Sequence, residues 1–331
     1  MCWFNYFTFL KFINALKILL SYLLSIGFKK VFLWGKPISL TVEPTNFCNL
    51  QCPECPTGNN TIKREKGFLS ISNYTKIIDT LAPWLLYHMI YFQGEPFLHP
   101  DIFSMIHYAH QRKIYTCTST NGHFLSYENA LKIINSGLDK IIISVDGVTQ
   151  ETYEKYRKGG SLKKVISGIQ TLSTLKKSKK SKTPEIVIQF LVFRFNEHQI
   201  NDIKKLGKSL GANRVEIKSA QMEQDIKNWN LIPQNKELSR YQVINNQFKL
   251  KNKLKNRCFR IWSTMVITWD GKILPCCFDK TAQHNIGNLN QISILALWNS
   301  EEYTSFRKKI LTNRKKIEIC TNCTSGLHIK S

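Results

Sequence analysis

The chain has 331 residues, of which 43% are hydrophobic and 11% aromatic, which is enough for one large domain and a small appendage. Its 47 lysines and arginines outnumber 23 aspartates and glutamates. This excess favours anionic partners such as a membrane surface, a nucleic acid or a phosphorylated compound, and a solvated surface in a lysine-rich chain explains it equally well. Ten cysteines in a chain of this length exclude a small secreted disulfide protein and favour thiolate ligands in a reducing cytoplasm.

Residues 1–36 are predicted to form an amphipathic helix. Between Phe4 and Phe28 the sequence is strongly apolar, and its polar residues recur at three- and four-residue steps along one stripe. The stripe consists of Lys11, Asn14, Lys17, Ser21 and Ser25. Lys17 interrupts the run of about 20 apolar residues that a spanning helix needs, so we predict that residues 4–28 contact a membrane interface. A helix packed into the protein core is the alternative, and the lack of a small-x-small cleavage site disfavours a signal peptide.

From residue 37 to residue 220, short apolar runs alternate with helical stretches. Six strands are predicted, over 38–43, 87–92, 114–120, 140–145, 186–193 and 214–218. Helices are predicted between them, over 73–82, 101–112, 126–136, 161–176 and 197–210. Repeated strand–helix units form parallel sheets, and these spacings suit an open barrel or a doubly wound sheet. In either fold the reactive groups gather at the carboxyl ends of the strands.

The rest of the chain is predicted to contain a polar, partly helical linker over 221–257 and a second module over 258–331. The second module begins with two apolar runs around an Asp270–Gly271 turn, which is the pattern of a β-hairpin. It also has its own group of cysteines, so we treat it as a separate functional unit.

The first group of cysteines follows directly after the first predicted strand. Cys48, Cys52 and Cys55 have the spacing Cys-x3-Cys-x2-Cys on one short segment. Three thiolates can bind three irons of a cubane cluster, and the fourth iron then has no ligand from this segment. An open coordination site on a metal is where a substrate or cosubstrate binds, as open zinc sites illustrate. The spacing therefore predicts a cluster with one vacant iron.

This segment resembles the signature of the radical S-adenosylmethionine (SAM) superfamily. The resemblance implies a [4Fe-4S] cluster whose vacant iron chelates SAM, and reductive cleavage of SAM to a 5′-deoxyadenosyl radical that abstracts hydrogen from a substrate. It also implies the fold, a partial (β/α)6 barrel, and an external reductant such as flavodoxin or ferredoxin. The sequence departs from the family pattern at Glu54, because relatives usually carry an aromatic residue before the third cysteine.

The sequence after the second predicted strand resembles the segment that holds the SAM amino group in relatives. It reads Gln93-Gly94-Glu95-Pro96, with Gln93 in place of the first glycine of the family motif. A glycine permits close backbone approach, and a carboxylate complements an ammonium group. The resemblance therefore implies that Gly94 and Glu95 bind SAM.

Three residues near the ends of later strands also match segments that line the SAM pocket in the family. The resemblance implies SAM contacts by Asn121 and Ser144, of which Ser144 is the more direct. Arg157, in the sequence YRKGG, matches the arginine that meets the SAM carboxylate, a role that suits a guanidinium. For Asn121, Asp146 and Arg157, turn chemistry or an ordinary surface charge is the alternative.

Four more cysteines lie in the second module at steps of 18, 44 and 3 residues, namely Cys258, Cys276, Cys320 and Cys323. The predicted hairpin would bring the first two together, and the terminal pair would complete four ligands. This pattern resembles the SPASM/twitch extension of radical SAM proteins, and its steps are similar to those of 2-deoxy-scyllo-inosamine dehydrogenase. The resemblance implies one auxiliary [4Fe-4S] cluster for electron transfer or structural support. A four-thiolate zinc site is the alternative.

The other cysteines and the histidines are expected to be structural. Cys2 and Cys117 suit small buried hydrophobes, and Cys277 is an alternative ligand beside Cys276. The histidines before residue 124 suit packing or surface positions, although His123, next to Asn121, is placed to face the pocket.

Together these features predict a radical SAM oxidoreductase that dehydrogenates a sugar- or lipid-linked small molecule with help from the auxiliary cluster. A maturase that modifies a ribosomal peptide or a protein is the alternative within the superfamily. A non-catalytic zinc- or nucleic-acid-binding protein is the alternative of another class, although it leaves Cys48 and the strand-end motifs unexplained. We expect a cytoplasmic enzyme, peripheral on the inner face of the membrane, and no nucleic-acid partner.

Overall fold

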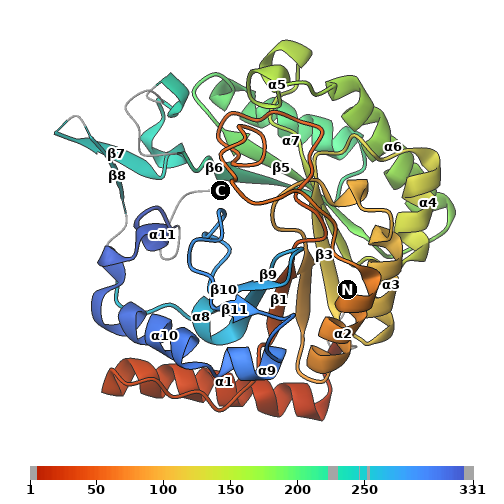
Figure 1. Ribbon diagram of the computed structural model, residues 1–331. Helices are drawn as coiled ribbons and strands as arrows, with labels where there is room; N and C mark the ends of the chain where they lie inside the picture. The colour runs from red at the N-terminus through yellow and green to blue at the C-terminus, as the bar shows by residue number, and fades with distance from the viewer. Residues whose placement is uncertain (1–5, 223–229, 246, 252–253, 324–331) are drawn as a thin grey trace. The chain divides into compact units, whose positions relative to one another are not determined.

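The computed structural model describes residues 6–222, 230–245, 247–251 and 254–323, so Cys2 lies outside the described residues. The described chain divides into two compact units, seen in Figure 1. Unit 1 holds residues 6–47, 62–118 and 254–323, and unit 2 holds residues 48–61 and those from 119 to 251. The three cysteines of the first group therefore belong to unit 2, and the four of the second group belong to unit 1.

A parallel sheet forms the centre of unit 1. β1 (Ser39–Val42) pairs in parallel with β2 (Tyr87–Ile90) on one side and with β9 (Thr264–Ile267) on the other. β2 also pairs in parallel with β3 (Tyr115–Thr120). The sheet thus joins strands that lie more than 200 residues apart in the sequence, so the C-terminal segment is an integral part of unit 1.

The predicted hairpin is present at the edge of this sheet. β10 (Lys272–Leu274) runs antiparallel to β9, and β11 (Gly287–Asn288) runs antiparallel to β10. Gly271, in the turn between β9 and β10, has a φ of 81°, a conformation that glycine adopts at little cost. The Asp270–Gly271 signal therefore identified this turn.

Helices bury the sheet of unit 1. α2 (Ile71–Leu81) and α3 (Ile102–Gln111) follow β1 and β2, and Ser70 caps the first of them by accepting a hydrogen bond of 3.2 Å from the amide of Asn73. The C-terminal segment adds α8 (Arg260–Ser263), α9 (Ile294–Trp298), α10 (Glu301–Asn313) and α11 (Glu318–Thr321). The fully buried Trp262 and Trp298 join these short helices to one core.

Unit 2 repeats the strand–helix pattern. β5 (Glu185–Val192) lies between β4 (Lys140–Ser144) and β6 (Arg214–Ser219), and both pairings are parallel. The centres of β4 and β5 are β-branched residues buried on both faces, as expected for parallel strands covered by helices. The helices are α4 (Tyr127–Asn135), α5 (Gln150–Tyr156), α6 (Leu162–Ser178) and α7 (Ile200–Ser209).

The six strands and five helices predicted between residues 37 and 220 are confirmed, with ends shifted by a few residues. The pattern missed α5, which is only 7 residues long. It also missed an antiparallel pair, β7 (Tyr241–Ile244) and β8 (Gln247–Leu250), within the predicted linker. Further short 3-10 segments lie at Pro96–Leu98, Glu197–Gln199, Lys236–Leu238 and Arg314–Lys316. In the described part of the linker, the helical conformation is thus limited to 3-10 turns, at 236–238 and at residues 230 and 231.

Helix α1 (Phe9–Phe28) is present, as the apolar run predicted. Its polar residues do share one face, with the exception of the exposed Lys17. This face is the buried one, together with Ile18, which belongs to the core of unit 1, and the partly buried Tyr22 and Ile26, which pack against that core. The helix thus has one side packed on the core, in line with the alternative considered above, and one side of exposed apolar residues.

The stability of the fold depends on pH through His88 on β2. Its ring is fully buried and contacts the Leu40 carbonyl at 3.2 Å and the Tyr74 hydroxyl at 3.0 Å. Burial lowers the pKa of His88 to about 4, so the unfolded chain, with an ordinary pKa of 6.5, binds the proton more tightly. Stability from this residue is complete above pH 6.5 and is lost as the pH falls toward 4.

We therefore expect His88 to lower the free energy of unfolding by about 1.4 kcal/mol between pH 7.5 and pH 5.5. Urea unfolding of the native protein and of His88→Gln at both pH values measures this difference. His99 and His123 remain in both proteins, so the difference isolates His88. The same loss of stability in the two proteins would contradict the assignment.

Candidate active site

The first cysteine group lies on a loop that closes on itself. The amide of Cys55 donates to the carbonyl of Cys52 at 3.2 Å, and the amide of Leu50 approaches the Cys48 sulfur at 3.5 Å. Cys52 is buried, and its backbone is in such close contact with Gly58 that a Cβ at that glycine would lie 2.5 Å from the Cys52 nitrogen. The loop has no regular secondary structure, and its three cysteines pack in or against the same hydrophobic cluster.

Asn121 lies beside this loop, as its position at the end of β3 predicted. Its side-chain amide donates to the Asn49 side chain at 2.7 Å and approaches the Cys48 sulfur at 4.0 Å. His123 contacts Asn121 at 3.0 Å and accepts a hydrogen bond of 2.8 Å from the amide of Ser161. His123 thus joins the segment after β3 to the start of α6, a structural role.

Arg157 and Asp146 form a buried ion pair next to the same loop. Arg157 Nε donates to Asp146 Oδ2 at 2.6 Å, and Arg157 Nη1 lies 3.9 Å from the Cys52 sulfur. Asp146 Oδ1 also accepts a hydrogen bond of 2.7 Å from the amide of Leu191. Ser144, two residues before Asp146, is buried at the carboxyl end of β4. Of the predicted SAM contacts, Asn121 and Arg157 therefore adjoin the cysteine loop through side-chain contacts, and Ser144 ends the strand that leads to Asp146.

The charges of Arg157 and Asp146 affect the pKa of the Cys52 thiol. Burial alone disfavours the charged guanidinium, but Asp146, Cys52 and nearby phenols raise the pKa of Arg157 well above its usual range. Burial raises the pKa of the Cys52 thiol, and the positive charge of Arg157 works against that shift. A metal-bound cysteine is a thiolate, so a fixed positive charge beside Cys52 favours the form that binds iron.

Gly94 and Glu95 lie in unit 1, against the backbone that leads into the cysteine loop. Gly94 has a φ of 76°, and a Cβ there would lie 2.5 Å from the Thr45 carbonyl oxygen and 2.6 Å from that of Phe47. The amide of Glu95 donates to the Phe47 carbonyl at 2.7 Å, and its carboxylate accepts a hydrogen bond of 3.2 Å from the amide of Phe97. This segment therefore positions residues 45–47, and its contact with SAM stays a prediction.

We expect Gly94→Ala to lower the free energy of unfolding by about 1–3 kcal/mol and to reduce the iron bound per chain, because both the φ and the space require glycine. Thermal unfolding and iron analysis measure these effects. Gly159→Ala is the matched control, since Gly159 has a φ of 78° but no atom within 4 Å of an added Cβ. An equal loss in the two variants would mean that the close approach to residues 45–47 is unimportant.

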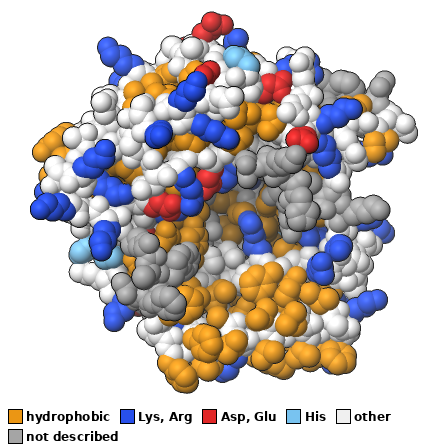
Figure 2. All heavy atoms as spheres, turned by 180° about the vertical axis from the view of Figure 1, so that it is seen from behind, with side chains coloured by type: hydrophobic (Ala, Val, Ile, Leu, Met, Phe, Trp, Pro, Cys, Tyr) orange, Lys and Arg blue, Asp and Glu red, His pale blue; other side chains and the backbone are white. Residues whose placement is uncertain are grey.

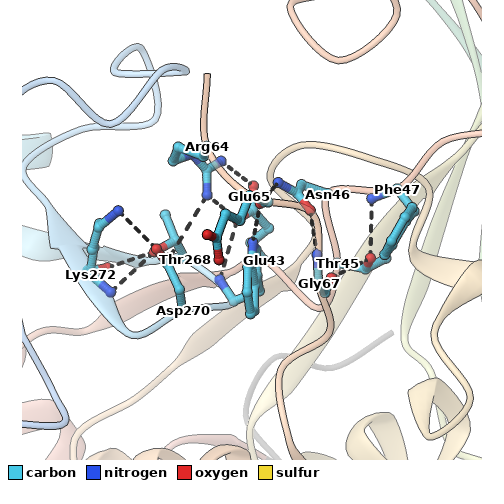
Figure 3. Close-up of polar contacts among 11 residues, drawn as sticks. Glu43, Thr45, Asn46, Phe47, Arg64, Glu65, Gly67, Thr268, Asp270 and Lys272 are labelled. Atoms are coloured by element: carbon cyan, nitrogen blue, oxygen red, sulfur yellow. Dashed lines mark hydrogen bonds and ion pairs between the residues drawn. The ribbon is translucent and has the colours of Figure 1, made fainter. Parts of the chain in front are cut away.

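A polar network within unit 1, shown in Figure 3, joins the two segments that flank the cysteine loop. The fully buried Glu43 forms a two-pronged ion pair with Arg64, with N–O distances of 2.7 and 2.8 Å. Asn46 donates to the Glu65 carbonyl at 2.8 Å and accepts from the amide of Gly67 at 3.0 Å. Residues 43–47 precede the loop and residues 64–67 follow it, so the network fixes where the loop begins and where it ends.

The hairpin turn between β9 and β10 completes this network. The amide of Trp269 donates to Glu43 at 3.2 Å, and the Trp269 ring nitrogen donates to the Glu65 carbonyl at 3.2 Å. Asp270 lies 3.9 Å from Arg64. Within unit 1, the C-terminal segment therefore holds the two segments that flank the cysteine loop, 43–47 and 64–67.

Two arginines, Arg314 and Arg260, lie beside the second cysteine group. Arg314 is 2% exposed, its Nη2 lies 3.5 Å from the Cys323 sulfur, and its Nε has no hydrogen-bond partner among the described residues. Burial opposes the charge of Arg314, but Cys258, Cys323 and Cys320 raise its pKa. Arg260 donates to the Cys277 sulfur, and its pKa is raised mainly by Cys277 and further by Cys276 and Cys258. The structure thus brings the four predicted ligands within electrostatic reach of two guanidiniums.

This arrangement fits a cluster. In the part of the chain that the structure describes, no three His, Cys, Asp or Glu side chains are close enough to hold a single metal ion. A buried guanidinium needs negative charge nearby, and the described contacts of Arg314 include no carboxylate. Four thiolates on a cluster would supply that charge.

A cavity of about 380 Å³ opens inside unit 1. It is lined by residues of β1, β2 and β9, by Gln93 of the predicted SAM segment, and by Arg260, Cys277 and Lys280 of the C-terminal segment. Its volume is in the range of sites that bind small molecules. Two of its lining residues are cations and none is acidic.

Comparison with known proteins identifies the class. The family model of the radical SAM superfamily matches residues 42–207, half of the chain, so the protein belongs to this superfamily. The SPASM model, an iron–sulfur cluster-binding domain, matches residues 258–324. The enzyme therefore uses a [4Fe-4S] cluster and SAM, as predicted. Its SPASM domain implies auxiliary iron–sulfur cluster binding, which was also predicted. The particular ligand residues stay predictions that the arrangement described above supports.

Three curated relatives share parts of the sequence. Mycofactocin maturase MftC of Mycobacterium ulcerans is 30% identical over 176 residues, which cover 53% of this chain and 46% of that protein. PqqA peptide cyclase of Gluconobacter oxydans is 28% identical over 187 residues, 56% of this chain and 50% of that one. The cofactor-modifying protein of the tungsten-containing aldehyde ferredoxin oxidoreductase from Pyrococcus furiosus is 24% identical over 86% of each chain. The chain thus spans about half the length of the first two relatives.

Solved structures confirm the fold. Streptococcus suis SuiB bound to precursor peptide SuiA has a TM-score of 0.64 at 15% identity and covers 95% of this chain and 76% of that one. BtrN in complex with AdoMet and 2-DOIA has a TM-score of 0.55 at 18% identity and covers 89% of this chain and 96% of that one. The predicted partial (β/α)6 barrel with a C-terminal SPASM-like domain is therefore confirmed.

Proposed function

We propose that this enzyme is a maturase that modifies a peptide by radical SAM chemistry. The proposal depends on the sequence similarity to two curated relatives, a mycofactocin maturase and a peptide cyclase. Each of them aligns with about half of this chain. The likeness in fold to SuiB, which is known with a bound precursor peptide, is consistent with it. This replaces our sequence-based preference for a sugar- or lipid-linked substrate as the first candidate.

In this proposal Cys48, Cys52 and Cys55 hold three irons and leave the fourth for SAM. The bound cluster and SAM supply a 5′-deoxyadenosyl radical, which takes a hydrogen atom from the substrate. The chain positions SAM through Gly94, Glu95, Asn121, Ser144 and Arg157. Its other task is to exclude water and stray hydrogen donors, because a primary carbon radical reacts with any C–H bond within reach.

The auxiliary cluster is proposed to be held by Cys258, Cys276, Cys320 and Cys323. The arginines beside these cysteines, Arg314 and Arg260, would balance its negative charge. A fully ligated cluster has no iron for substrate, so its role is electron transfer or structural support. The electron that starts each turnover is proposed to come from an external reductant such as flavodoxin or ferredoxin.

The cations that line the cavity of unit 1 favour a substrate that carries an acidic group. Arg260 and Lys280 line it together with aromatic residues of the strand ends. A cation pair in a partly enclosed site favours a carboxylate or a phosphate. A peptide with an aspartate or glutamate near the modified residue would meet this requirement.

The second candidate is oxidation of a sugar- or lipid-linked small molecule. BtrN, a radical SAM dehydrogenase, is covered over 96% of its length by this chain, and SuiB over only 76% of its length. The likeness in fold to BtrN over most of this chain is consistent with this candidate. In this case the auxiliary cluster would accept the substrate's second electron.

One experiment separates the two candidates. Anaerobically reconstituted enzyme is given dithionite, SAM and the low-mass fraction of a cell extract, and release of 5′-deoxyadenosine is followed. A peptide substrate predicts that protease treatment of the fraction removes the stimulation, whereas periodate leaves it. Stimulation that survives protease and is destroyed by periodate would overturn the peptide proposal in favour of a sugar.

The proposed location is the cytoplasm, because thiolate ligands and a low-potential cluster require a reducing compartment. We also propose that the enzyme is peripheral on the inner face of the membrane. α1 is long and apolar enough, by length and composition, to contact or cross a bilayer. Fractionation of cells that express the chain with or without residues 1–30 tests this location, and an unchanged distribution would overturn it.

A further inference from the structure

Helix α1 is attached to unit 1 by its polar side. Lys11, Asn14, Ser21 and Ser25 are all at most 4% exposed. Their partners are backbone groups of other segments, so each bond holds the helix at a defined position. The Lys11 ammonium donates to the Lys113 carbonyl at 2.5 Å.

The segment after the helix folds back along this polar face. Asn14 exchanges two hydrogen bonds of 2.9 and 2.8 Å with the backbone of Lys36. The amide of Trp34 donates to the Ser21 hydroxyl at 2.9 Å, and the amide of Phe32 donates to the Ser25 hydroxyl at 2.9 Å. Polar residues at three- and four-residue steps thus serve as a row of backbone anchors.

The opposite face of α1 is apolar and exposed along its whole length. Phe9 is 81% exposed, Phe28 at the other end is 70% exposed, and Trp34 on the returning segment is 54% exposed. Between them the exposed residues are Leu10, Phe12, Leu16, Leu19, Leu20 and Leu23. Figure 2 shows hydrophobic side chains gathered along the lower edge of the molecule, where α1 lies in Figure 1. We call this set the outer face of α1.

Such a face is unusual for a helix that is otherwise well anchored. Scattered exposed hydrophobic residues are normal, but a continuous stripe over 20 residues, about 30 Å long, marks a surface for an apolar partner. The aromatic residues at both ends of the stripe suit the boundary between headgroups and acyl chains.

The charge around the outer face identifies that partner. Lys17, Lys29 and Lys30 are exposed next to it, and residues 1–42 contain no aspartate or glutamate. Positive charge beside an exposed apolar stripe complements a bilayer with anionic lipids. Two copies of this face packed together would instead bring like charges together, which disfavours a dimer through α1.

We propose that the outer face of α1 is a docking surface for the anionic surface of a lipid bilayer, with the helix lying in the plane of the interface. The polar anchors decide against a spanning helix, because crossing the bilayer would break all of them and expose Lys11, Asn14, Ser21 and Ser25 to lipid. This inference rests on the membrane location proposed above and specifies the lipid and the orientation of the helix. It does not depend on the proposed substrate, since it concerns a surface of unit 1 and not the reaction.

Vesicle sedimentation tests the docking surface. Vesicles of phosphatidylcholine mixed with phosphatidylglycerol should sediment the purified full-length protein, whereas pure phosphatidylcholine should sediment much less of it. The triple variant Leu16→Glu/Leu20→Glu/Leu23→Glu should bind the anionic vesicles roughly tenfold or more weakly. Each of Lys17→Gln, Lys29→Gln and Lys30→Gln should weaken binding about fivefold. Equal sedimentation of the native protein and the glutamate variant would overturn the proposal.

The matched control places the same charges on exposed hydrophobic residues that do not belong to α1, namely Tyr127→Glu, Val243→Glu and Ile292→Glu. This variant should bind like the native protein, and an equal loss of binding in it would also overturn the proposal. Both variants should keep the native thermal midpoint, because none of the altered side chains is buried.

Two further measurements exclude other occupants of the outer face. An alkaline carbonate wash should release the bound protein, and retention after the wash would mean a spanning helix and overturn the interfacial placement. Light scattering should give the same mass for the native protein and the glutamate variant. A native dimer that the glutamate variant converts to a monomer, without vesicle binding, would assign the face to a second copy and overturn the lipid proposal.

Discussion

Replacing Arg64 by methionine is expected to lower the free energy of unfolding by about 3–5 kcal/mol. The change leaves the carboxylate of Glu43 fully buried. The hydrogen bond from the Trp269 amide then remains in place of the two-pronged ion pair. Because this pair braces both ends of the loop that carries Cys48, the variant should also retain less iron after reconstitution. Urea unfolding and iron analysis measure the two effects.

Two companion variants make this prediction specific. The double variant Glu43→Gln/Arg64→Met removes the buried charge together with its partner, and it should recover at least half of the lost stability. Arg112→Met breaks an ion pair with Asp79 that is largely exposed, and it should cost at most about 1 kcal/mol. A loss in Arg64→Met no larger than that in Arg112→Met would show that the buried pair does not support the loop.

Replacing Arg314 by methionine is expected to lower the reduction potential of the auxiliary cluster by roughly 60–130 mV. This range corresponds to the loss of one charged hydrogen bond of about 1.5–3 kcal/mol for a one-electron couple. Removing a positive charge beside Cys258, Cys320 and Cys323 makes an added electron less stable. The measurement is a redox titration followed by electron paramagnetic resonance, in a background where the first cysteine group is replaced by alanine, so that only the auxiliary cluster is present.

Arg307→Met is the matched control for this prediction. Arg307 is also fully buried, but its guanidinium lies over the rings of Trp298 and Tyr303 and donates to backbone carbonyls. It should therefore change stability while leaving the potential where it was. An unchanged potential in Arg314→Met, or an equal shift in Arg307→Met, would contradict the role assigned to Arg314.

The strands could be predicted, and the metal ligands could be proposed, because their signals are local. Runs such as Ile141–Ile143 are buried on both faces, and the spacing of Cys48, Cys52 and Cys55 is visible within eight residues of sequence. The resemblance of short strand-end motifs to a known family likewise led to Asn121 and Arg157, which the structure places beside the cysteine loop.

The supporting residues could not be predicted because their partners are distant or belong to the backbone. Glu43 and Arg64 are 21 residues apart with no periodic relation. Arg314 and Arg260 are two among 47 lysines and arginines, and only the fold brings them to the cysteines. The pair β7 and β8 turns at Asn245, with a φ of 51°, a weaker turn signal than a glycine.

For helix α1, the sequence predicted the two stripes but not which of them faces the protein. Its periodicity separated a polar stripe from an apolar one, which the structure confirms. Which stripe faces the protein depends on hydrogen bonds to the backbone at Phe32, Trp34 and Lys36, and no side-chain pattern reveals those bonds. A helix buried by its polar side is therefore recognisable only in three dimensions.

The central claim is that one loop holds three irons and leaves a corner for SAM. The most direct measurement compares iron, sulfide and 5′-deoxyadenosine release in the reconstituted native protein and in a Cys48→Ala/Cys52→Ala/Cys55→Ala variant. We expect about eight irons per native chain, about four in the variant, and release of 5′-deoxyadenosine by the native protein alone. Zinc in place of iron in the oxygen-free native protein, or undiminished release by the variant, would contradict the account.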